Sequence, residues 1–333
     1  MRNVGVREIS RKTGFSPATV SNALSNKRNV SRETSEKILA VAKELGYARR
    51  GKVARVVFVL ARKTGEVLDE GTFHPGVMEG VEKAASAVGL PMSFVTLDLT
   101  SPNAASQASD IARDITSAVV LLGTEMRGDD YSLFAETEAP LVVVDGWSDH
   151  LFFDCVVTAN ESSAFRATSY LVEHGHKDIG YIAGAYRIKN FPLRERGYRR
   201  ALREAGLAAN PAFRVEVGTT VSTAYEAMRS WLETKPLLPT AFFAENDTMA
   251  LGAMRAMVEA GVSIPDDVSF VGFDDLPFAT VATPPLTTMR IPNHEMGSIA
   301  VDLLMEQLNA PRYYQKTIHL STMMIERDSV RSI

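Results

Sequence analysis

The chain has 333 residues, 45% of them hydrophobic and 23% charged, which is enough for two or three domains with hydrophobic cores. It has no run of about eighteen apolar residues and no apolar stretch near its amino terminus, so we expect neither a membrane span nor a signal peptide. A single cysteine, Cys155, argues against a disulfide framework and a cysteine-based zinc site. The expected compartment is the cytoplasm.

The net charge of −4 conceals an uneven distribution. Residues 1–55 hold 13 of the 36 Lys and Arg but only 4 of the 40 Asp and Glu, so the balance is +9 there and −13 in the remainder. A basic head on an acidic body is typical of a nucleic-acid-binding module joined to another domain. A basic helical surface that is merely solvated is the alternative.

The head is predicted to contain three short helices. The first ends at Thr13, and Gly14 then supplies a left-handed turn. The third begins after the cap residue Ser31, carries apolar residues at spacings of three and four, and closes at Gly46. Two helices joined by a glycine-containing turn and braced by a third predict a helix-turn-helix domain. A three-helix bundle with another purpose is the alternative.

The second helix lies within GFSPATVSNAL, residues 14–24, with Ser16 as its N-cap and Pro17 in its first position. Its apolar stripe is Val20, Ala23 and Leu24. The opposite face is polar, uncharged and slim. Such a face can enter a DNA major groove, which is about 12 Å wide, and offer hydrogen-bonding groups to base edges.

The segment VREISRKTGFSPATVSNALSNKRNVSRETSEKILAVAKELGY resembles the DNA-binding domain of the lactose-repressor (LacI/GalR) family of bacterial transcription regulators. The resemblance implies that Pro17, Ala18 and Asn22 contact bases, and that Asn29 lies near the groove. It also implies a set of phosphate-contacting residues, namely Ser16, Thr19, Ser21, Ser31 and Thr34. We add Arg7 as a further DNA contact.

Asn22 departs from the family pattern, in which many members have arginine at this position. Arginine suits the O6 and N7 atoms of guanine, whereas asparagine suits N6 and N7 of adenine. We therefore expect this protein to recognise a different base at that step.

The linker after the head, residues 48–55, is shorter than in family members, which place a hinge helix with a groove-inserting leucine here. No such leucine is present, and Val56 in its place belongs to the apolar run VVFVL. We expect a short basic linker without a hinge helix.

From residue 56 onward, short apolar runs rich in β-branched residues alternate with helical segments. Continuous apolar strands of this kind predict parallel sheets covered by helices on both faces. Their number favours two doubly wound α/β subdomains, with a ligand bound beyond the carboxyl ends of the strands, in the cleft between them.

The body also resembles that of the same family, whose fold is shared with periplasmic sugar-binding proteins, through the motifs EHGHKDIGYIAG, PTAFFAENDTMALGAM and DDVSFVGFDD. The resemblance implies a head at 1–47 and an effector-binding and dimerisation body at 56–333, with three crossings of the chain between subdomains. The expected subdomains are about 56–158 plus 290–322, and about 159–289 plus 323–333.

Several polar residues are expected to bind an effector because they match family positions or follow predicted strands. Asn246 and Asp274 are expected to contact it, whereas their neighbours Asp247 and Asp275 cap or brace the backbone. The set also includes Arg194, Asp145 of the first subdomain, and the pair Phe73 and His74, which follows an unusually long loop. The expected effector-binding residues are therefore Phe73, His74, Asp145, Arg194, Asn246 and Asp274.

Asn, Asp and Arg beside an aromatic ring are typical of sites for polyols, because they form paired hydrogen bonds to adjacent hydroxyls. A purine or another metabolite remains an alternative, and Arg194 could equally meet a carboxylate or phosphate. His174 and His176 lack a carboxylate or cysteine at ligand spacing, so we expect no metal, and the family uses this segment structurally.

We therefore expect a cytoplasmic transcription regulator, most simply a repressor that binds palindromic operator DNA as a homodimer and senses a sugar-like effector. A solute-binding protein would need export. An enzyme would need catalytic residues, but no G-x-S-x-G, GxxxxGK[ST] or HExxH motif occurs. We predict no catalytic residues, no cofactor and no membrane partner.

Overall fold

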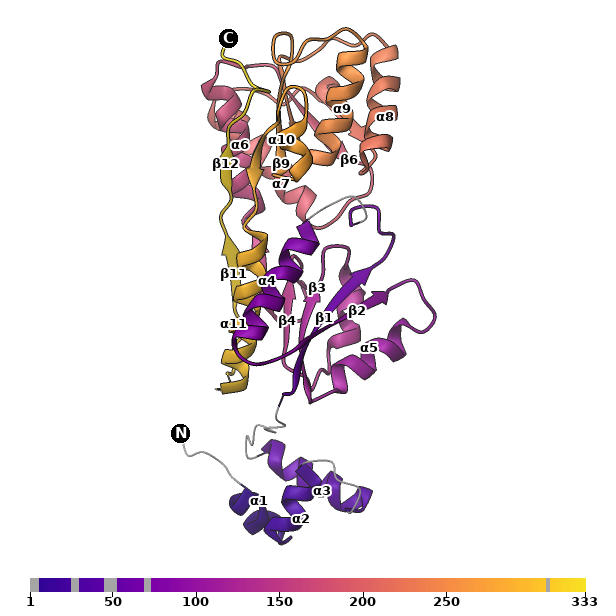
Figure 1. The fold of residues 1–333 in the computed structure, drawn as a ribbon, viewed down its shortest axis with the longest axis vertical. Helices are drawn as coiled ribbons and strands as arrows, with labels where there is room; N and C mark the ends of the chain where they lie inside the picture. Colours follow the sequence, from indigo (N-terminus) through magenta and orange to yellow (C-terminus); the bar gives the residue numbers. More distant parts are fainter. Residues whose placement is uncertain (1–5, 25–29, 45–52, 69–72, 310–311) are drawn as a thin grey trace.

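A computed structural model describes the chain except for residues 1–5, 25–29, 45–52, 69–72 and 310–311. Its amino-terminal part is a small helical head (Figure 1), made of α1 Val6–Thr13, α2 Pro17–Leu24 and α3 Arg32–Glu44. The three helices bury one apolar cluster: Ile9, Val20, Ala23, Leu24, Ile38 and Ala42. The predicted end of the first helix and the apolar stripe of the second are confirmed.

Capping by serine explains where α2 and α3 begin. The Ser16 hydroxyl accepts the Thr19 N–H at 3.1 Å, and the Ser31 hydroxyl accepts the Thr34 N–H at 3.2 Å. Gly14 has a φ of +76°, the left-handed conformation that the turn requires. Both caps and the turn were predicted from the sequence. The expected end of the third helix at Gly46 lies outside the described residues.

The body contains two six-stranded sheets. We call the parts that carry them the first and the second subdomain. The first sheet is wholly parallel, and its strands follow in spatial order: β11 Thr317–Leu320, β5 Asp154–Thr158, β4 Leu141–Val144, β3 Ser117–Leu122, β1 Arg55–Arg62 and β2 Met92–Asp98. Its helical elements are α4 Phe73–Ala87, α5 Ala104–Arg113, η1 Gly128–Phe134 and α11 Asn293–Asn309.

The second sheet is parallel except for β12, which pairs antiparallel with β10. Its strands in spatial order are β12 Met323–Ile325, β10 Thr287–Arg290, β9 Ser269–Asp274, β8 Ala241–Ala244, β6 Ile179–Gly184 and β7 Arg214–Val217. Its helical elements are α6 Asn160–Glu173, α7 Asn190–Glu204, η2 Pro211–Phe213, α8 Val221–Glu233, α9 Asp247–Glu259 and α10 Pro277–Val281.

The middle strands of each sheet form where the sequence is mainly apolar, as expected for sheets covered on both faces. β3, β4, β6 and β8 are buried along their whole length. The chain passes between the sheets after β5, after β10 and after β11, and β11 and β12 run in succession along both subdomains (Figure 1). The predicted α/β fold class, with a helical head and two doubly wound subdomains, is confirmed.

The position where β1 begins determines which residues are left for the linker between head and body. β1 begins at Arg55, and Val56 has no exposed surface and lies between Met92 of β2 and Ala118 of β3. Val56 therefore belongs to the strand, as predicted. Residues 45–52 lie outside the described residues, so the absence of a hinge helix stays a prediction. No helix in the described part of the chain is both long and apolar enough to span a lipid bilayer.

Candidate functional site

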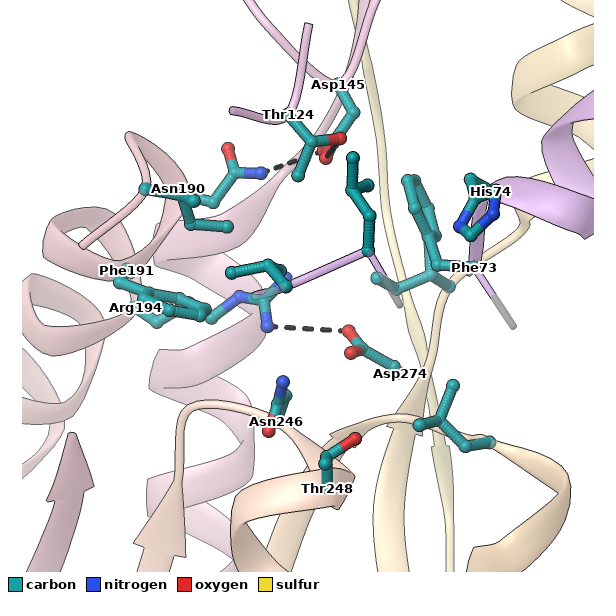
Figure 2. Close-up of a pocket in the computed structure, with 15 residues that line it drawn as sticks. Phe73, His74, Thr124, Asp145, Asn190, Phe191, Arg194, Asn246, Thr248 and Asp274 are labelled. Carbon is teal, nitrogen blue, oxygen red and sulfur yellow. Dashed lines mark hydrogen bonds and ion pairs between the residues drawn. The ribbon is translucent and has the colours of Figure 1, made fainter. Parts of the chain in front are cut away.

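One cavity between the subdomains collects all the residues that the sequence predicted for effector binding. Phe73 and His74 begin α4, Asp145 follows β4, and Arg194 lies on α7. Asn246 follows β8, and Asp274 is the last residue of β9. The six line the same cavity (Figure 2). The carboxyl ends of parallel strands meet there, as expected for a ligand site in this fold.

The cavity has further lining residues that sequence reasoning missed. They are three polar side chains and a larger apolar set: Thr124, Asn190, Thr248, Val67, Leu68, Ile188, Phe191, Leu276 and Ile291. Thr124 follows the apolar run of β3 just as Asp145 follows β4, and that position is the signal that could have identified it.

Arg194 is buried and held on several sides. Its Nε donates to the Asn160 side-chain oxygen at 2.8 Å, and its Nη1 donates to the Glu245 carbonyl and lies 3.4 Å from the Asp274 carboxylate. The guanidinium carbon lies 3.8 Å from the centre of the Phe273 ring. These contacts fix the direction in which the guanidinium faces the cavity.

Asp145 reaches the cavity from the first subdomain. Its carboxylate accepts the Thr124 hydroxyl at 2.7 Å and the Asn190 amide at 2.8 Å (Figure 2). Because Asn190 begins α7, the second of these bonds joins the two subdomains. Burial raises the pKa of Asp145 from 3.8 to about 6, against the opposing effects of both hydrogen bonds and the Arg194 charge.

Asp274 shares that arginine with Asp145. Burial raises the pKa of Asp274 from 3.8 to about 7, and the Asp145 charge adds to the rise whereas Arg194 opposes it. The backbone of Asp274 has a φ of +113°, an unusual value for a residue with a side chain, which turns the chain at the end of β9. The cavity therefore holds one buried carboxyl group, that of Asp145, and one partly buried carboxyl group, that of Asp274, around one guanidinium.

Asn246 has a structural role in addition to its place in the cavity. Asn246 is the N-cap of α9, because its side-chain oxygen accepts the Met249 N–H at 2.8 Å. Its amide nitrogen points toward the cavity (Figure 2). Asp247 braces the structure as expected, since it accepts the Leu276 N–H at 2.8 Å and the Thr288 hydroxyl at 2.5 Å.

Asp275 also has a structural position, but through side chains rather than as a cap. Its two carboxylate oxygens lie 2.6 Å from Arg290, at the end of β10, and 2.6 Å from Arg327, beyond β12. His176, raised as a metal candidate, contacts the Thr240 hydroxyl at 3.0 Å and the Arg331 carbonyl at 3.1 Å. Nε2 thus holds the carboxyl-terminal segment, whereas Nδ1 holds the residue that precedes β8.

On the head, the predicted base-contacting face of α2 is accessible. Pro17, Ala18 and Ser21 are exposed, and Asn22 is half-buried. The hydroxyls of Ser16 and Thr19 lie 2.9 Å apart, and Ser31 donates its hydroxyl to Thr34 at 2.8 Å. Arg7 is exposed on α1. Asn29 lies outside the described residues.

Comparison with known proteins agrees with this architecture. Residues 6–50 match the model of bacterial regulatory proteins of the lacI family, and residues 168–330 match a periplasmic binding protein-like domain. The chain is 30% identical over 331 residues to the HTH-type transcriptional repressor PurR of Pasteurella multocida (strain Pm70), covering 98% of each chain.

Two further relatives carry names that refer to sugars. The Ribose operon repressor of Haemophilus influenzae (strain ATCC 51907 / DSM 11121 / KW20 / Rd) is 30% identical over 332 residues, covering 98% of this chain and 99% of the relative. The solved structure of the transcriptional regulator CelR–cellobiose complex has a TM-score of 0.73 and 27% identity, covering 98% of this chain and 99% of that one.

A helix-turn-helix head joined to a two-subdomain body with a polar cleft defines the class of ligand-responsive DNA-binding regulators. The chain belongs to the lacI family of bacterial regulatory proteins, and it is an effector-responsive DNA-binding regulator of transcription.

Proposed function

We propose that this protein is a repressor that binds a palindromic operator as a homodimer and senses a neutral, sugar-like molecule in the cleft. The observation that carries the proposal is the convergence of Asp145, Arg194, Asn246 and Asp274 on one cavity beside Phe73. Carboxylate, amide and guanidinium groups next to a ring suit adjacent hydroxyls and an apolar sugar face. The ribose and cellobiose in the names of two relatives support the same ligand class.

A neutral effector is favoured over an anionic one by the charges of the cavity. Its described lining includes one arginine and two aspartates. Arg194 already contacts Asp274, Asn160 and the Glu245 carbonyl. A phosphate or carboxylate would therefore meet two carboxyl groups with little positive charge in compensation.

For DNA contact we propose the exposed face of α2 together with the caps of α2 and α3. Pro17, Ala18 and Asn22 would contact bases, as expected for a recognition helix. The remaining proposed contacts are Arg7, Ser16, Thr19, Ser21, Asn29, Ser31 and Thr34. A single head offers few contacts, so a twofold pair of heads on a palindrome is the arrangement that gives tight binding.

The homodimer proposal is supported by large apolar side chains that remain exposed. Phe94 on the edge strand β2 is 49% exposed, Val258 on α9 is 49% exposed, and Val281 on α10 is 77% exposed. β2 and α9 lie along one side of the body (Figure 1). Exposed apolar side chains on these elements suit a subunit interface.

The remaining parts of the proposal concern organisation and chemistry. We propose a head at 1–47, a short linker at 48–55 and a body at 56–333, whose subdomains are divided as the sequence predicts. The protein would act in the cytoplasm, where its DNA is. It would bind its ligands without converting them and without a cofactor.

Calorimetry tests the effector site. We would titrate the protein with ribose, glucose, cellobiose and adenine, and compare the wild type with Asp145→Asn and Asp274→Asn. We expect a neutral probe to bind the wild type and to bind each variant about tenfold more weakly, because a buried partner of the ligand is altered. DNA binding by the head should persist. Wild-type affinity in Asp274→Asn would refute the assignment.

A further inference from the structure

The segment Lys63–Leu68, which we name the strap, follows β1 and belongs to the unusually long loop before α4. It leaves the carboxyl end of the strand, which is the end that faces the cleft (Figure 1). Its last two residues, Val67 and Leu68, line the effector cavity. Nothing in the proposed polar contacts with the effector accounts for this segment.

The base of the strap is fastened by a buried carboxylate. One oxygen of Glu125 accepts three successive backbone N–H groups, from Lys63 at 2.7 Å, Thr64 at 3.0 Å and Gly65 at 3.0 Å. Glu125 has no exposed surface. Three N–H groups converging on one anion form a nest, which the first subdomain fills with its own side chain. The Lys63 ammonium adds an ion pair to Asp130 at 3.0 Å.

The tip of the strap contacts the second subdomain. Thr219 lies just after β7, and its hydroxyl donates to the Glu66 carbonyl at 3.0 Å. Val67 packs against the apolar core of the second subdomain, whereas Leu68 belongs to the core that includes β1. The strap thus spans from one subdomain to the other beside the cavity.

Space in the cavity is small while the strap is in this position. The cavity measures about 40 Å³. A single water requires about 10–15 Å³ by this measure, so the cavity has room for only a few waters. A sugar ring is larger, and its entry requires the strap or the subdomains to shift.

We propose that the strap is the specificity-determining wall of the effector site and that Glu125 is the residue that positions it. This inference rests on the proposed function. Val67 and Leu68 would cover an apolar face of the effector, while the carboxylates and Arg194 bind its polar groups. Because the strap contacts both subdomains, its position would determine which apolar surface of the effector can be covered.

The test uses the full-length protein and two variants with a matched control. Glu125→Ala removes the acceptor of the strap amides. Val67→Thr keeps the shape of the side chain but places a hydroxyl against the ligand. This second variant still tests the inference if Glu125→Ala fails to fold. The control is Asp98→Ala, because Asp98 also ends a strand and holds its own loop through Thr100 at 2.9 Å but does not line the cavity.

Two measurements are made on each protein: hydrogen exchange of the amides at 63–65, and calorimetry with ribose, glucose, cellobiose and adenine. We expect the hydrogen-exchange rate of these amides to be at least about tenfold higher in Glu125→Ala than in the wild type, because their acceptor is removed. Glu125→Ala and Val67→Thr should each bind the wild type's best ligand about tenfold more weakly, whereas Asp98→Ala should match the wild type.

The outcomes separate this inference from the proposed function. If a probe binds the wild type and both variants bind it within twofold of that affinity, the strap inference is overturned. If no probe binds the wild type, the proposed sugar-like effector fails, and the strap inference fails with it. Unchanged exchange at 63–65 in Glu125→Ala would refute the positioning role of Glu125.

Discussion

At the residue scale, the surroundings of Asp274 disfavour its ionised form, and the stability of the folded protein therefore depends on pH. Its pKa is about 7 in the folded protein, compared with 3.8 as the ordinary value. The folded state therefore keeps a proton that the unfolded state has released between these pH values. The resulting stabilisation is complete below about pH 4 and is lost as the pH rises through 7.

The variant Asp274→Asn cannot ionise and tests this directly. We expect its midpoint of thermal unfolding to decline less between pH 6 and pH 8 than that of the wild type, so that the variant gains relative stability at pH 8. Thermal unfolding without ligand at pH 6, 7 and 8 measures the difference. Parallel pH profiles for the two proteins would show that Asp274 is ionised throughout this range.

Asn22 carries a second prediction at this scale. It lies on α2 beside the exposed Ser21 and Ala18, where a longer side chain has room to extend. Asn22→Arg should change the preferred base at one position in each half-site, by about 1–3 kcal/mol, because arginine favours guanine and asparagine favours adenine. Selection of binding sites from random DNA by both proteins checks it. The same half-site for both would contradict a base contact.

Residue-level prediction identified residues that line the cavity where a polar side chain directly follows an apolar strand or matches a family position, as with Asp145, Arg194 and Asp274. It missed Asn190 and Val67, because their place in the cavity depends on which loops meet across the two sheets. Asn246 serves both as a helix cap and as a group facing the cavity, because its amide carries an acceptor oxygen and a donor nitrogen.

At the element scale, the boundary between linker and β1 decides how the head can act on DNA. Val56 is enclosed between two neighbouring strands and is unavailable for insertion into a groove. The basic linker can contact phosphates, but without an apolar wedge it does not open a base step. We predict that the operator is bent little and that specificity at its central step is weak.

Circular-permutation gels with operator fragments measure that bend. We expect nearly equal mobility for all fragments, and the same result with Val56→Ala. A strong central kink that Val56→Ala abolishes would show that a hinge helix forms on DNA and draws Val56 from the strand.

Strands such as β3, β4 and β8 were predictable because each is an apolar run that differs in pattern from the helices around it. The antiparallel β12 was not, since its short segment MMI has no pattern to distinguish its direction. The contacts of the strap also escaped prediction. They join Glu125 and Thr219, which lie far from the strap along the chain.

At the scale of the whole molecule, contacts between subdomains surround the effector site. Asn190 reaches Asp145, Lys189 reaches the Trp147 carbonyl at 3.0 Å and Asp149 at 2.8 Å, and the strap reaches Thr219. A ligand that alters these contacts changes how the subdomains lie relative to one another. Such a change is how the cleft would control the spacing of two heads.

Salt dependence tests the electrostatic part of DNA binding. Residues 1–55 have a charge balance of +9, whereas the remainder of the chain has a balance of −13. We expect the logarithm of DNA affinity to fall linearly and steeply with the logarithm of salt concentration, because bound counterions are released from phosphates. Fluorescence anisotropy over a range of potassium chloride concentrations gives the slope. A slope near zero would contradict phosphate contact by the head.

The central claim is that two heads of a homodimer bind one palindrome under the control of a ligand in the cleft. Selection of binding sites from a random DNA pool by the wild-type protein, with and without the neutral ligand that binds in calorimetry, tests it most directly. The account predicts enrichment of a twofold-symmetric sequence and a ligand-dependent change in affinity for it. Enrichment of no symmetric sequence under either condition would contradict the account.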